Sequence, residues 1–295
     1  MIPYGKHHID EDDIQAVVDV LRHGMLTQGP KVAEFENKMS NYVGSKYAVA
    51  VSNGTAALHL ACMALGLGKG DEVITSPNTF VATSNSVLYV GAKPVFVDID
   101  EQTLNIDIDK LEQTINNSNS IKAIFPVHFA GLACDMKKIK ELADKYNLAI
   151  VEDAAHAIGA TYINGNKVGD CQYSNMTIFS FHPVKGIAAG EGGVITTNDE
   201  ELYHKLTLLR SHGITKGNFV FPGGSLADDS LINKDDALEN GELKRWYCEM
   251  QHLGYNYRIT DIQCALAISQ MDKIDLFLDA RRSMVKVYDK AFKDI

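Results

Sequence analysis

Short apolar stretches alternate with helix-length segments through most of this 295-residue chain, and this alternation constrains its fold more than any other feature. A short apolar run without alternating polar residues is typical of a strand that is buried on both faces. We expect seven such strands: AVAVS (48–52), DEVITS (71–76), KPVFVDI (93–99), IKAIFPV (121–127), LAIVED (148–153), MTIFSF (176–181) and GGVITT (192–197). Their alternation with helices predicts an α/β fold, with a largely parallel sheet covered by helices on both faces.

Helical periodicity fills most of the segments between these strands and continues at both ends of the chain. At the start, Asp10 stands three residues before Asp13, which suits an N-terminal cap, and Gly24 suits the end of that helix. A second helix is expected from about Val32. The segments with helical spacing inside the α/β pattern are 55–65, 79–89, 109–115, 136–146 and 200–210.

The pattern divides the chain into three parts. Residues 1–24 are expected to form an N-terminal arm and helix, and residues 25–258 a large α/β domain. Within that domain, residues 217–246 lack periodicity and are rich in Gly, Asp and Asn, which favours a loop or an insertion. Residues 259–295 return to a helical pattern that stops in the middle of a helix, so we expect this chain to be a fragment.

Charge and cysteine content argue against several classes of function. The 28 basic and 38 acidic side chains give a net charge of −10, which argues against nucleic-acid binding. No window approaches 18 apolar residues and the N-terminus lacks the apolar stretch of a signal peptide, so we expect a cytoplasmic protein with no membrane partner. The five cysteines are too widely spaced for a disulfide framework or a CxxC metal site, and no metal is expected.

Two of the expected strands end in polar motifs. Each motif, taken alone, allows both a functional and a purely structural interpretation. SNGTAAL (52–58) turns into a helix whose N-terminal amides suit a phosphate, although such a motif is more often a simple turn. In VEDAAHA (151–157), Glu152 and Asp153 end a buried strand, where a carboxylate is costly unless a positive group meets it. The alternative for that motif is an acidic helix cap. His156 follows three residues later, placed to share the same site.

A third strand end carries a lysine. FSFHPVKG (179–186) places Lys185 in a loop bounded by Pro and Gly, just before GEGG (190–193). A partly desolvated lysine loses its proton more easily and can form an imine with an aldehyde, whereas the alternative is an ordinary surface lysine. The carboxyl ends of parallel strands meet at one edge of a sheet. A phosphate anchor, a buried carboxylate and a nucleophilic lysine at that edge predict pyridoxal 5′-phosphate (PLP) as the cofactor.

The chain also resembles a known family over almost its whole length. Its consecutive motifs are similar to those of the DegT/StrS-type sugar aminotransferases: GMLTQGPKVAEFE, SNGTAALHLA, GDEVITSPNTFVAT, GAKPVFVDID, VEDAAHAIGA, FSFHPVKGIAAGEGGV and GYNYRITDIQCAL. The resemblance implies the type I, aspartate aminotransferase-like fold of PLP-dependent transferases. It also implies that residues 259–295 begin a smaller C-terminal domain whose remainder is absent from this chain. Within the family, the SFH-x-x-K-x-x-x-x-GEGG form looks most like the UDP-4-amino-4,6-dideoxy-N-acetyl-β-L-altrosamine transaminases of pseudaminic acid biosynthesis.

The resemblance assigns roles at the cofactor. It implies that Lys185 is the Schiff-base lysine and the base that moves the proton, that Asp153 pairs with the pyridine nitrogen, and that His156 lies near the ring hydroxyl. It also implies an aromatic stack on the ring and a group of phosphate ligands. Phe80 is the stacking residue, and the phosphate ligands are Thr55, Ala56 and Ser180.

Other matching positions imply a shared active site and a substrate pocket. Asn256 matches a residue that reaches the phosphate from the neighbouring subunit, which implies a homodimer. Arg258 suits the carboxylate of glutamate, with a structural ion pair as the alternative. The positions that match the lining of the sugar-nucleotide pocket are Tyr4, Met25, Leu26 and Thr27.

The function that this resemblance implies is amino transfer from L-glutamate to the 4-keto carbon of a UDP-linked 4-keto-6-deoxy-N-acetylhexosamine. The alternatives are an aminotransferase for another nucleotide-linked keto sugar, and a non-catalytic or truncated sugar-nucleotide binding protein of the same fold. Some members of the family are dehydratases that usually have His in place of the lysine, and Lys185 argues against that activity.

Overall fold

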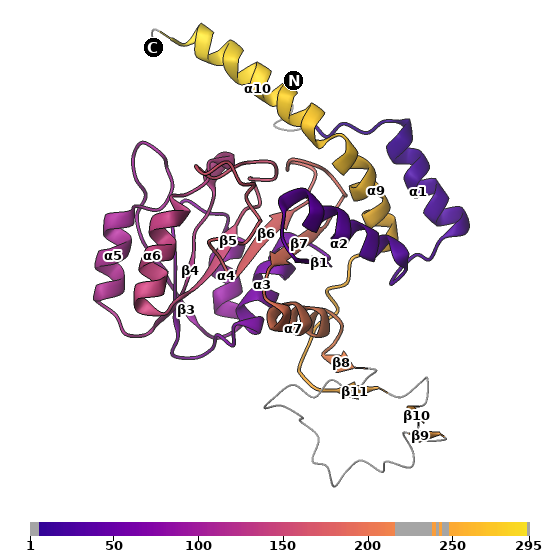
Figure 1. Cartoon of the computed structure of the whole chain (residues 1–295), viewed down its shortest axis with the longest axis horizontal. Helices are drawn as coiled ribbons and strands as arrows, with labels where there is room; N and C mark the ends of the chain where they lie inside the picture. Colours follow the sequence, from indigo (N-terminus) through magenta and orange to yellow (C-terminus); the bar gives the residue numbers. More distant parts are fainter. Residues whose placement is uncertain (1–5, 216–237, 240–241, 244–247, 294–295) are drawn as a thin grey trace.

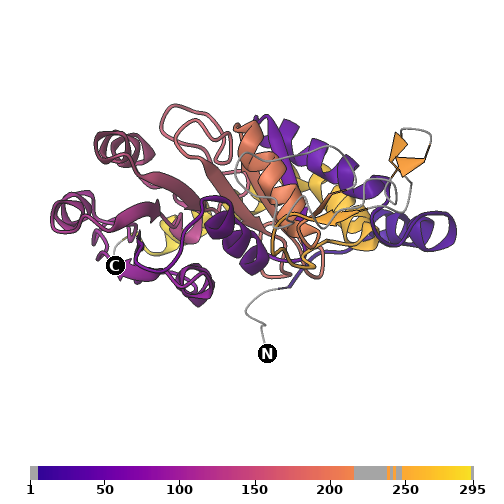
Figure 2. The ribbon, with the colours of Figure 1, turned by 90° about the horizontal axis from the view of Figure 1, so that it is seen from below.

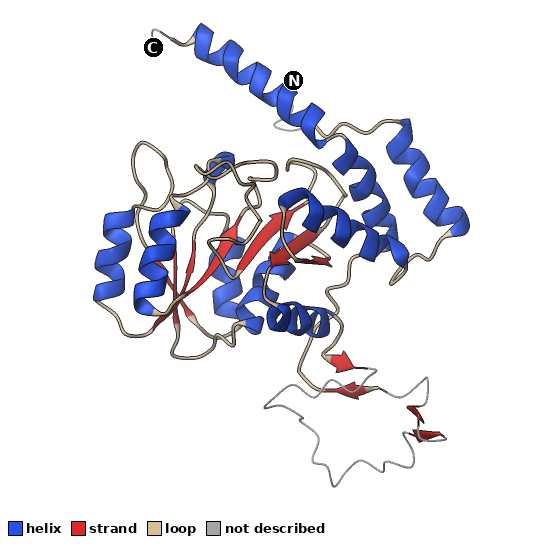
Figure 3. Ribbon diagram, viewed as in Figure 1, coloured by secondary structure: helices blue, strands red, loops and turns tan. Residues whose placement is uncertain are grey.

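A computed structural model describes residues 6–215, 238–239, 242–243 and 248–293, and within them a seven-stranded sheet forms the centre of the molecule (Figures 1 and 3). The strand order is β1-β7-β6-β5-β4-β2-β3. The strands are β1 (Tyr47–Val51), β2 (Glu72–Thr75), β3 (Lys93–Phe96), β4 (Ile121–Phe125), β5 (Ala149–Asp153), β6 (Met176–Ser180) and β7 (Gly193–Thr197). All seven predicted strands are therefore present.

The sheet is largely parallel, as predicted, with one exception. β7 runs antiparallel to both β1 and β6, whereas β2–β3, β2–β4, β4–β5 and β5–β6 are parallel pairs. The chain between β6 and β7 contains no helix. A parallel pair needs a crossover connection, usually a helix, so this short loop returns the chain in the opposite direction.

Helices cover both faces because strand side chains alternate between two apolar cores. In β1, Ala48 and Ala50 face the core that α2, α5, α6 and α9 close, while Val49 and Val51 face the core that α3, α4 and α7 close. The connecting helices are α3 (Gly54–Ala64), α4 (Val81–Tyr89), α5 (Ile108–Asn116), α6 (Met136–Tyr146) and α7 (Glu200–Arg210). α5 and α6 lie at one end of the molecule and α1 lies at the other (Figures 1 and 2).

The terminal helices pack against each other. The predicted cap is present at α1 (Glu11–His23), where Asp10 and Asp13 form a reciprocal capping box. Lys273 forms ion pairs with both aspartates and so ties α1 to the other end of the chain. The remaining long helices are α2 (Pro30–Val43), α9 (Asp261–Asp272) and α10 (Ile274–Ala291), and α10 projects away from the sheet (Figure 1).

The structure also contains short elements that the sequence did not predict. These are the 3-10 turn η1 (Phe129–Gly131) and the two-residue strands β8 (Ile214–Thr215), β9 (Leu238–Glu239), β10 (Glu242–Leu243) and β11 (Glu249–Met250). β8 pairs with β11, and β9 pairs with β10. Of residues 217–246, predicted as a loop or insertion, only β9 and β10 are described. In the described part of the chain, no helix combines the length and apolar character needed to span a membrane.

Candidate active site

One cavity of about 920 Å³ lies at the carboxyl ends of the central strands and the N-terminus of α3. It joins the three strand-end motifs, as expected for ligand sites in open α/β sheets. Seven of the residues that the sequence singled out line it: Thr55, Ala56, Phe80, Asp153, His156, Ser180 and Lys185. Residues that are up to 130 positions apart in the chain therefore surround one space.

The α3 end of the cavity is built from a helix N-terminus packed directly on the sheet. The Asn53 side chain caps α3 by accepting a hydrogen bond from the Ala56 amide at 2.8 Å. A Cβ on Gly54 would lie 3.0 Å from the Ser180 Cβ, and a Cβ on Gly193 would lie 2.5 Å from the Asn53 carbonyl oxygen. Glycine at these two positions allows the helix terminus and the Ser180 hydroxyl to share one wall, an arrangement that suits an anion.

Asp153 stands at the end of β5 and is almost completely buried, with 5% of the residue exposed. Its Oδ2 accepts a hydrogen bond of 2.6 Å from the Thr83 hydroxyl, and its Oδ1 accepts one of 3.1 Å from the Ala155 amide. The backbone is held as well, because the Asp153 amide donates to Pro126 and its carbonyl accepts from His128. The carboxylate is thus presented to the cavity from a rigid strand end.

Glu152 points to the opposite side of β5 and is fully buried. The sequence predicts that a carboxylate buried in this way needs partners that offset the cost of its burial. His128 Nε2 donates to its Oε2 at 2.7 Å, and the hydroxyls of Tyr162, Ser174 and Thr177 donate to the carboxylate at 2.5–2.9 Å. Burial by itself would raise the pKa of Glu152, but the hydrogen bond from His128, followed by those from the hydroxyl donors, lowers it overall. The carboxylate is therefore ionised and fully paired.

Lys185 lies in the loop between β6 and β7, and backbone hydrogen bonds within the loop hold its shape. The Lys185 amide donates to the His182 carbonyl at 2.8 Å, and the Ala189 amide donates to the Phe181 carbonyl at 2.9 Å. Burial lowers the pKa of the Lys185 amine, and the negative charge of Asp153 opposes that shift. Desolvation also lowers the pKa of His156, and the charge of Lys185 acts in the same direction. These three side chains therefore interact electrostatically inside one cavity.

The other predicted site residues do not line the cavity of a single chain. Asn256 is exposed and pairs with Ser211 in an isolated bridge, and Arg258 pairs with Val51 on the edge of the sheet. Tyr4 lies outside the described residues. Met25 and Leu26 are more than half exposed, and Thr27 pairs with Thr260.

The structure also brings into the cavity several residues that the sequence did not single out. They are Asn53, Asn78, Thr79, Tyr89, His128, Phe129, His182, Glu191 and Tyr257, among others. A signal for some of them was present: His128 directly follows the predicted strand 121–127, and Asn53 and His182 stand inside two of the three motifs. Tyr257 stands between Asn256 and Arg258 in the GYNYRITDIQCAL motif, whereas no local pattern distinguishes Tyr89, which tertiary packing alone places there.

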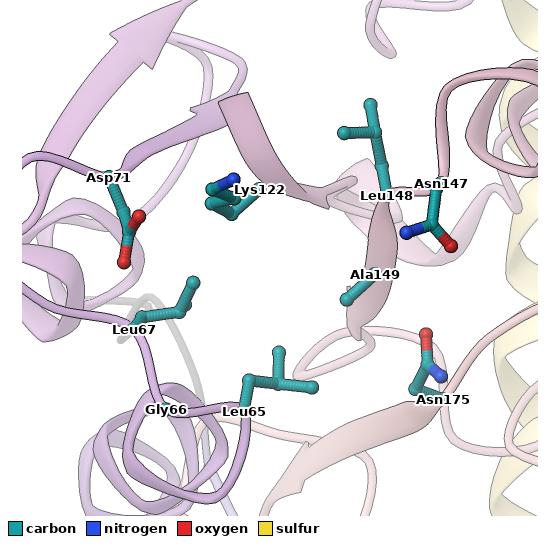
Figure 4. Close-up of a pocket in the computed structure, with 9 residues that line it drawn as sticks. All are labelled: Leu65, Gly66, Leu67, Asp71, Lys122, Asn147, Leu148, Ala149 and Asn175. Atoms are coloured by element: carbon teal, nitrogen blue, oxygen red, sulfur yellow. The ribbon is translucent and has the colours of Figure 1, made fainter. Parts of the chain in front are cut away.

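A second cavity of about 480 Å³ lies at the opposite edge of the sheet, beside the amino ends of β2, β4, β5 and β6 (Figure 4). Asp71 and Lys122 are its charged residues, and Asn147 and Asn175 are also part of its wall. None of the predicted site residues lines it. Because ligands of open α/β sheets bind at the carboxyl ends of the strands, the larger cavity is the candidate active site.

Comparison with known proteins matches the chain to an aminotransferase family over almost its whole length. Residues 7–295 match the profile of the DegT/DnrJ/EryC1/StrS aminotransferase family. The chain is 42% identical over 294 residues to the UDP-4-amino-4,6-dideoxy-N-acetyl-β-L-altrosamine transaminase of Campylobacter jejuni (serotype O:23/36, strain 81-176). The match covers 99% of this chain and 70% of that protein. It is also 42% identical over 296 residues to the spore coat polysaccharide biosynthesis protein SpsC of Bacillus subtilis, covering 100% of this chain and 70% of that one.

Solved structures of aminotransferases have a similar fold. Helicobacter pylori PseC, described as an aminotransferase involved in the biosynthesis of pseudoaminic acid, superposes with a TM-score of 0.84 at 32% identity over 99% of this chain and 71% of that one. The PLP form of the sugar aminotransferase Spr1654 from Streptococcus pneumoniae also superposes with a TM-score of 0.84, at 32% identity over 99% of this chain and 72% of that one. These neighbours confirm the predicted aminotransferase fold. The chain therefore belongs to the DegT/DnrJ/EryC1/StrS aminotransferase family.

Proposed function

We propose that this protein is a PLP-dependent aminotransferase that transfers an amino group to a nucleotide-linked keto sugar. The observation that carries the proposal is the meeting of Lys185, Asp153 and the N-terminus of α3 in one cavity. The donor set fits PLP at each of its polar groups. The amides and hydroxyls at Thr55 and Ser180 suit the phosphate, the Asp153 carboxylate suits a protonated ring nitrogen, and the half-buried amine suits the aldehyde.

PLP, when bound, supplies an aldehyde that condenses with an amine. It also supplies a ring that accepts electrons from the carbon atom attached to the amine nitrogen. Lys185 would hold the cofactor and, as a neutral amine, would carry the proton between the two carbons that exchange it. Its lowered pKa favours this role because a larger fraction is deprotonated near neutral pH. Asp153 would keep the ring nitrogen protonated. Phe80, 70% exposed in the cavity mouth, would cover one face of the ring, and His156 would lie beside its hydroxyl.

For the substrates we propose L-glutamate as the amino donor and a UDP-linked 4-keto-6-deoxy-N-acetylhexosamine as the acceptor. The C. jejuni relative, whose name specifies a UDP-linked amino-dideoxy-N-acetyl sugar, supports the choice of acceptor. A second candidate is another nucleotide-linked keto sugar, supported by a GDP-perosamine synthase of Caulobacter vibrioides that is 42% identical over 265 residues, covering 89% of this chain and 62% of that protein.

We further propose a homodimer with shared active sites. In that arrangement Asn256 of the partner subunit reaches the phosphate, and Arg258 binds the carboxylate of glutamate. Tyr4 and residues 25–27 line the sugar-nucleotide pocket. The exposed positions of Asn256, Met25 and Leu26 support the proposal, since each is free to enter a neighbouring site. Residues 1–24, 25–258 and 259–295 are proposed as arm, large domain and start of a small domain.

The test follows the cofactor by absorbance. Addition of PLP should produce the band of a lysine-bound imine, and L-glutamate should shift it to the band of the amine form. Lys185→Ala should abolish both, while Lys69→Ala, a change at an exposed lysine remote from the cavity, should abolish neither. A panel of UDP- and GDP-linked 4-keto sugars, analysed by mass spectrometry, then identifies the acceptor. Ligand binding without amino transfer would favour the non-catalytic alternative, and no imine band at all would reject the proposal.

A further inference from the structure

A buried hydroxyl on α4 holds the carboxylate that faces the proposed cofactor. Thr83 has no exposed surface, and its Oγ1 lies 2.6 Å from Asp153 Oδ2. The two residues come from different layers, one from a helix and one from the end of β5. The Thr83 hydroxyl donates to Asp153 Oδ2, so its single proton is committed to that bond.

That direction determines the next contact. Thr83 Oγ1 also lies 2.8 Å from the Oγ1 of Thr79. The Thr79 hydroxyl also lies 3.3 Å from the Phe80 carbonyl oxygen, but Thr83 Oγ1 is the nearer acceptor. With its own proton committed to Asp153, Thr83 accepts from Thr79, so the chain of donors runs from Thr79 through Thr83 to the carboxylate. Thr79 lines the cavity, whereas Thr83 lies behind its wall. Hydrogen bonds arranged in one direction polarise each other, which strengthens the final bond to Asp153.

The two donors to Asp153 leave its rotation fixed and its remaining lone pairs free. Thr83 holds Oδ2 and the Ala155 amide holds Oδ1. Each carboxylate oxygen accepts about two hydrogen bonds, so acceptor capacity remains for a group that enters the cavity. The hydroxyl thus determines the plane in which the carboxylate meets that group.

We propose that Thr83 is a positioning residue for Asp153, and that α4 sets two contacts of the cofactor ring at once. Phe80 is the N-cap residue of α4, and the Thr83 amide donates to its carbonyl at 3.1 Å. One helical turn therefore carries both the ring that covers the cofactor and the hydroxyl that orients the carboxylate for the pyridine nitrogen. This inference rests on the proposed function, because it assumes that PLP binds in the cavity.

The experiment compares Thr83→Val, which removes the hydroxyl at nearly constant volume, with Thr83→Ser, which keeps it. Ser84→Ala is the matched control, since that hydroxyl on the same helix donates to Val81 and not to Asp153. The readouts are the dissociation constant for PLP, the ¹⁵N chemical shift of the ring nitrogen of labelled PLP in the holoprotein, and the melting temperature without cofactor. A hydrogen bond to a charged group supports a loss of affinity on the order of tenfold for Thr83→Val.

Thr83→Val should also move the ¹⁵N shift toward the unprotonated ring, while Thr83→Ser and Ser84→Ala stay close to wild type in both readouts. Thr79→Val serves as the second variant in case Thr83→Val does not fold, and it should change both readouts in the same direction by a smaller amount. Where both fold, the double variant should match Thr83→Val alone, because the two hydroxyls act in series.

Two results would overturn the inference. The first is a Thr83→Val protein with wild-type affinity and ¹⁵N shift. The second is a loss in Thr83→Ser as large as in Thr83→Val, which would mean that packing and not the hydroxyl matters. Wild-type protein that forms no imine with PLP would instead reject the proposed function, and this inference with it.

Discussion

Glu152→Gln tests how much the hydrogen bonds of the buried Glu152 carboxylate contribute to the stability of the fold. The substitution keeps the shape of the side chain but replaces one oxygen by an NH₂ group that donates. With the amide oxygen toward the three hydroxyls, the Nε2–H of His128 would face another donor. With the amide flipped, its NH₂ group would face hydroxyls that now donate to the carboxylate, so either orientation loses hydrogen bonds. His128 cannot simply reverse its ring, because Nδ1 already accepts the Cys134 amide at 3.1 Å.

A buried N–H left without a partner costs roughly 1–3 kcal/mol, and the loss of the charged acceptor weakens the remaining bonds. We therefore expect the free energy of unfolding to fall by about 3 kcal/mol, near the lower end of the range for removing one partner of a buried pair. Urea denaturation at pH 7, followed by circular dichroism, measures this. Glu34→Gln is the control, because its ion pair with Lys31 is exposed and should contribute less than about 1 kcal/mol.

The same pair predicts a pH dependence. The pKa of Glu152 in the folded protein lies below its ordinary value of 4.5, so its contribution to stability is fully present above pH 4.5 and is lost as the pH falls further. The difference in unfolding free energy between wild type and Glu152→Gln should therefore shrink below pH 4.5. The reasoning is refuted if Glu152→Gln is as stable as wild type at pH 7, or if the difference grows in acid.

Three further predictions concern the helix termini and the lysine. Gly193→Ala should weaken PLP binding, measured by titration, because the new Cβ would press on the Asn53 carbonyl oxygen; unchanged binding would show that the turn can move. Asp261→Ala should lower the unfolding free energy by about 1–2 kcal/mol in urea denaturation, since the carboxylate caps two amides at the start of α2, and a change below 0.5 kcal/mol would contradict this. In competitive acetylation of the cofactor-free protein, Lys185 should react at lower pH than exposed lysines, because burial lowers its pKa; identical pH profiles would count against a desolvated amine.

The sheet could be predicted from the sequence because its signal is local. Each of the seven strands is a short apolar run, and the helices α6 and α7 begin and end at the predicted residues. The direction of β7 was not predicted, because apolar composition does not reveal strand direction. The absence of a helix between two strands does not decide it either, since the β5–β6 connection also lacks a helix and joins parallel strands. The strands of two residues are likewise too short to show a period.

The site could be predicted in part for the same reason. Each of Lys185, Asp153 and Thr55 ends or follows a predicted strand. The parallel order of the strands was therefore enough to predict that these residues meet at one edge of the sheet. Thr83 and His128 act through partners on other elements, and no spacing in the sequence reveals those contacts. For Glu152 the sequence indicated a carboxylate in need of partners, and the structure supplied a histidine and three hydroxyls in place of a single cation.

The most direct test of the account is to trap the bond between Lys185 and the cofactor. The protein is mixed with PLP, reduced with borohydride and digested, and the modified peptide is located by mass spectrometry. The account predicts one dominant label, on Lys185, which disappears in Lys185→Ala and weakens in Asp153→Asn. A label distributed over exposed lysines with Lys185 unmodified would contradict it.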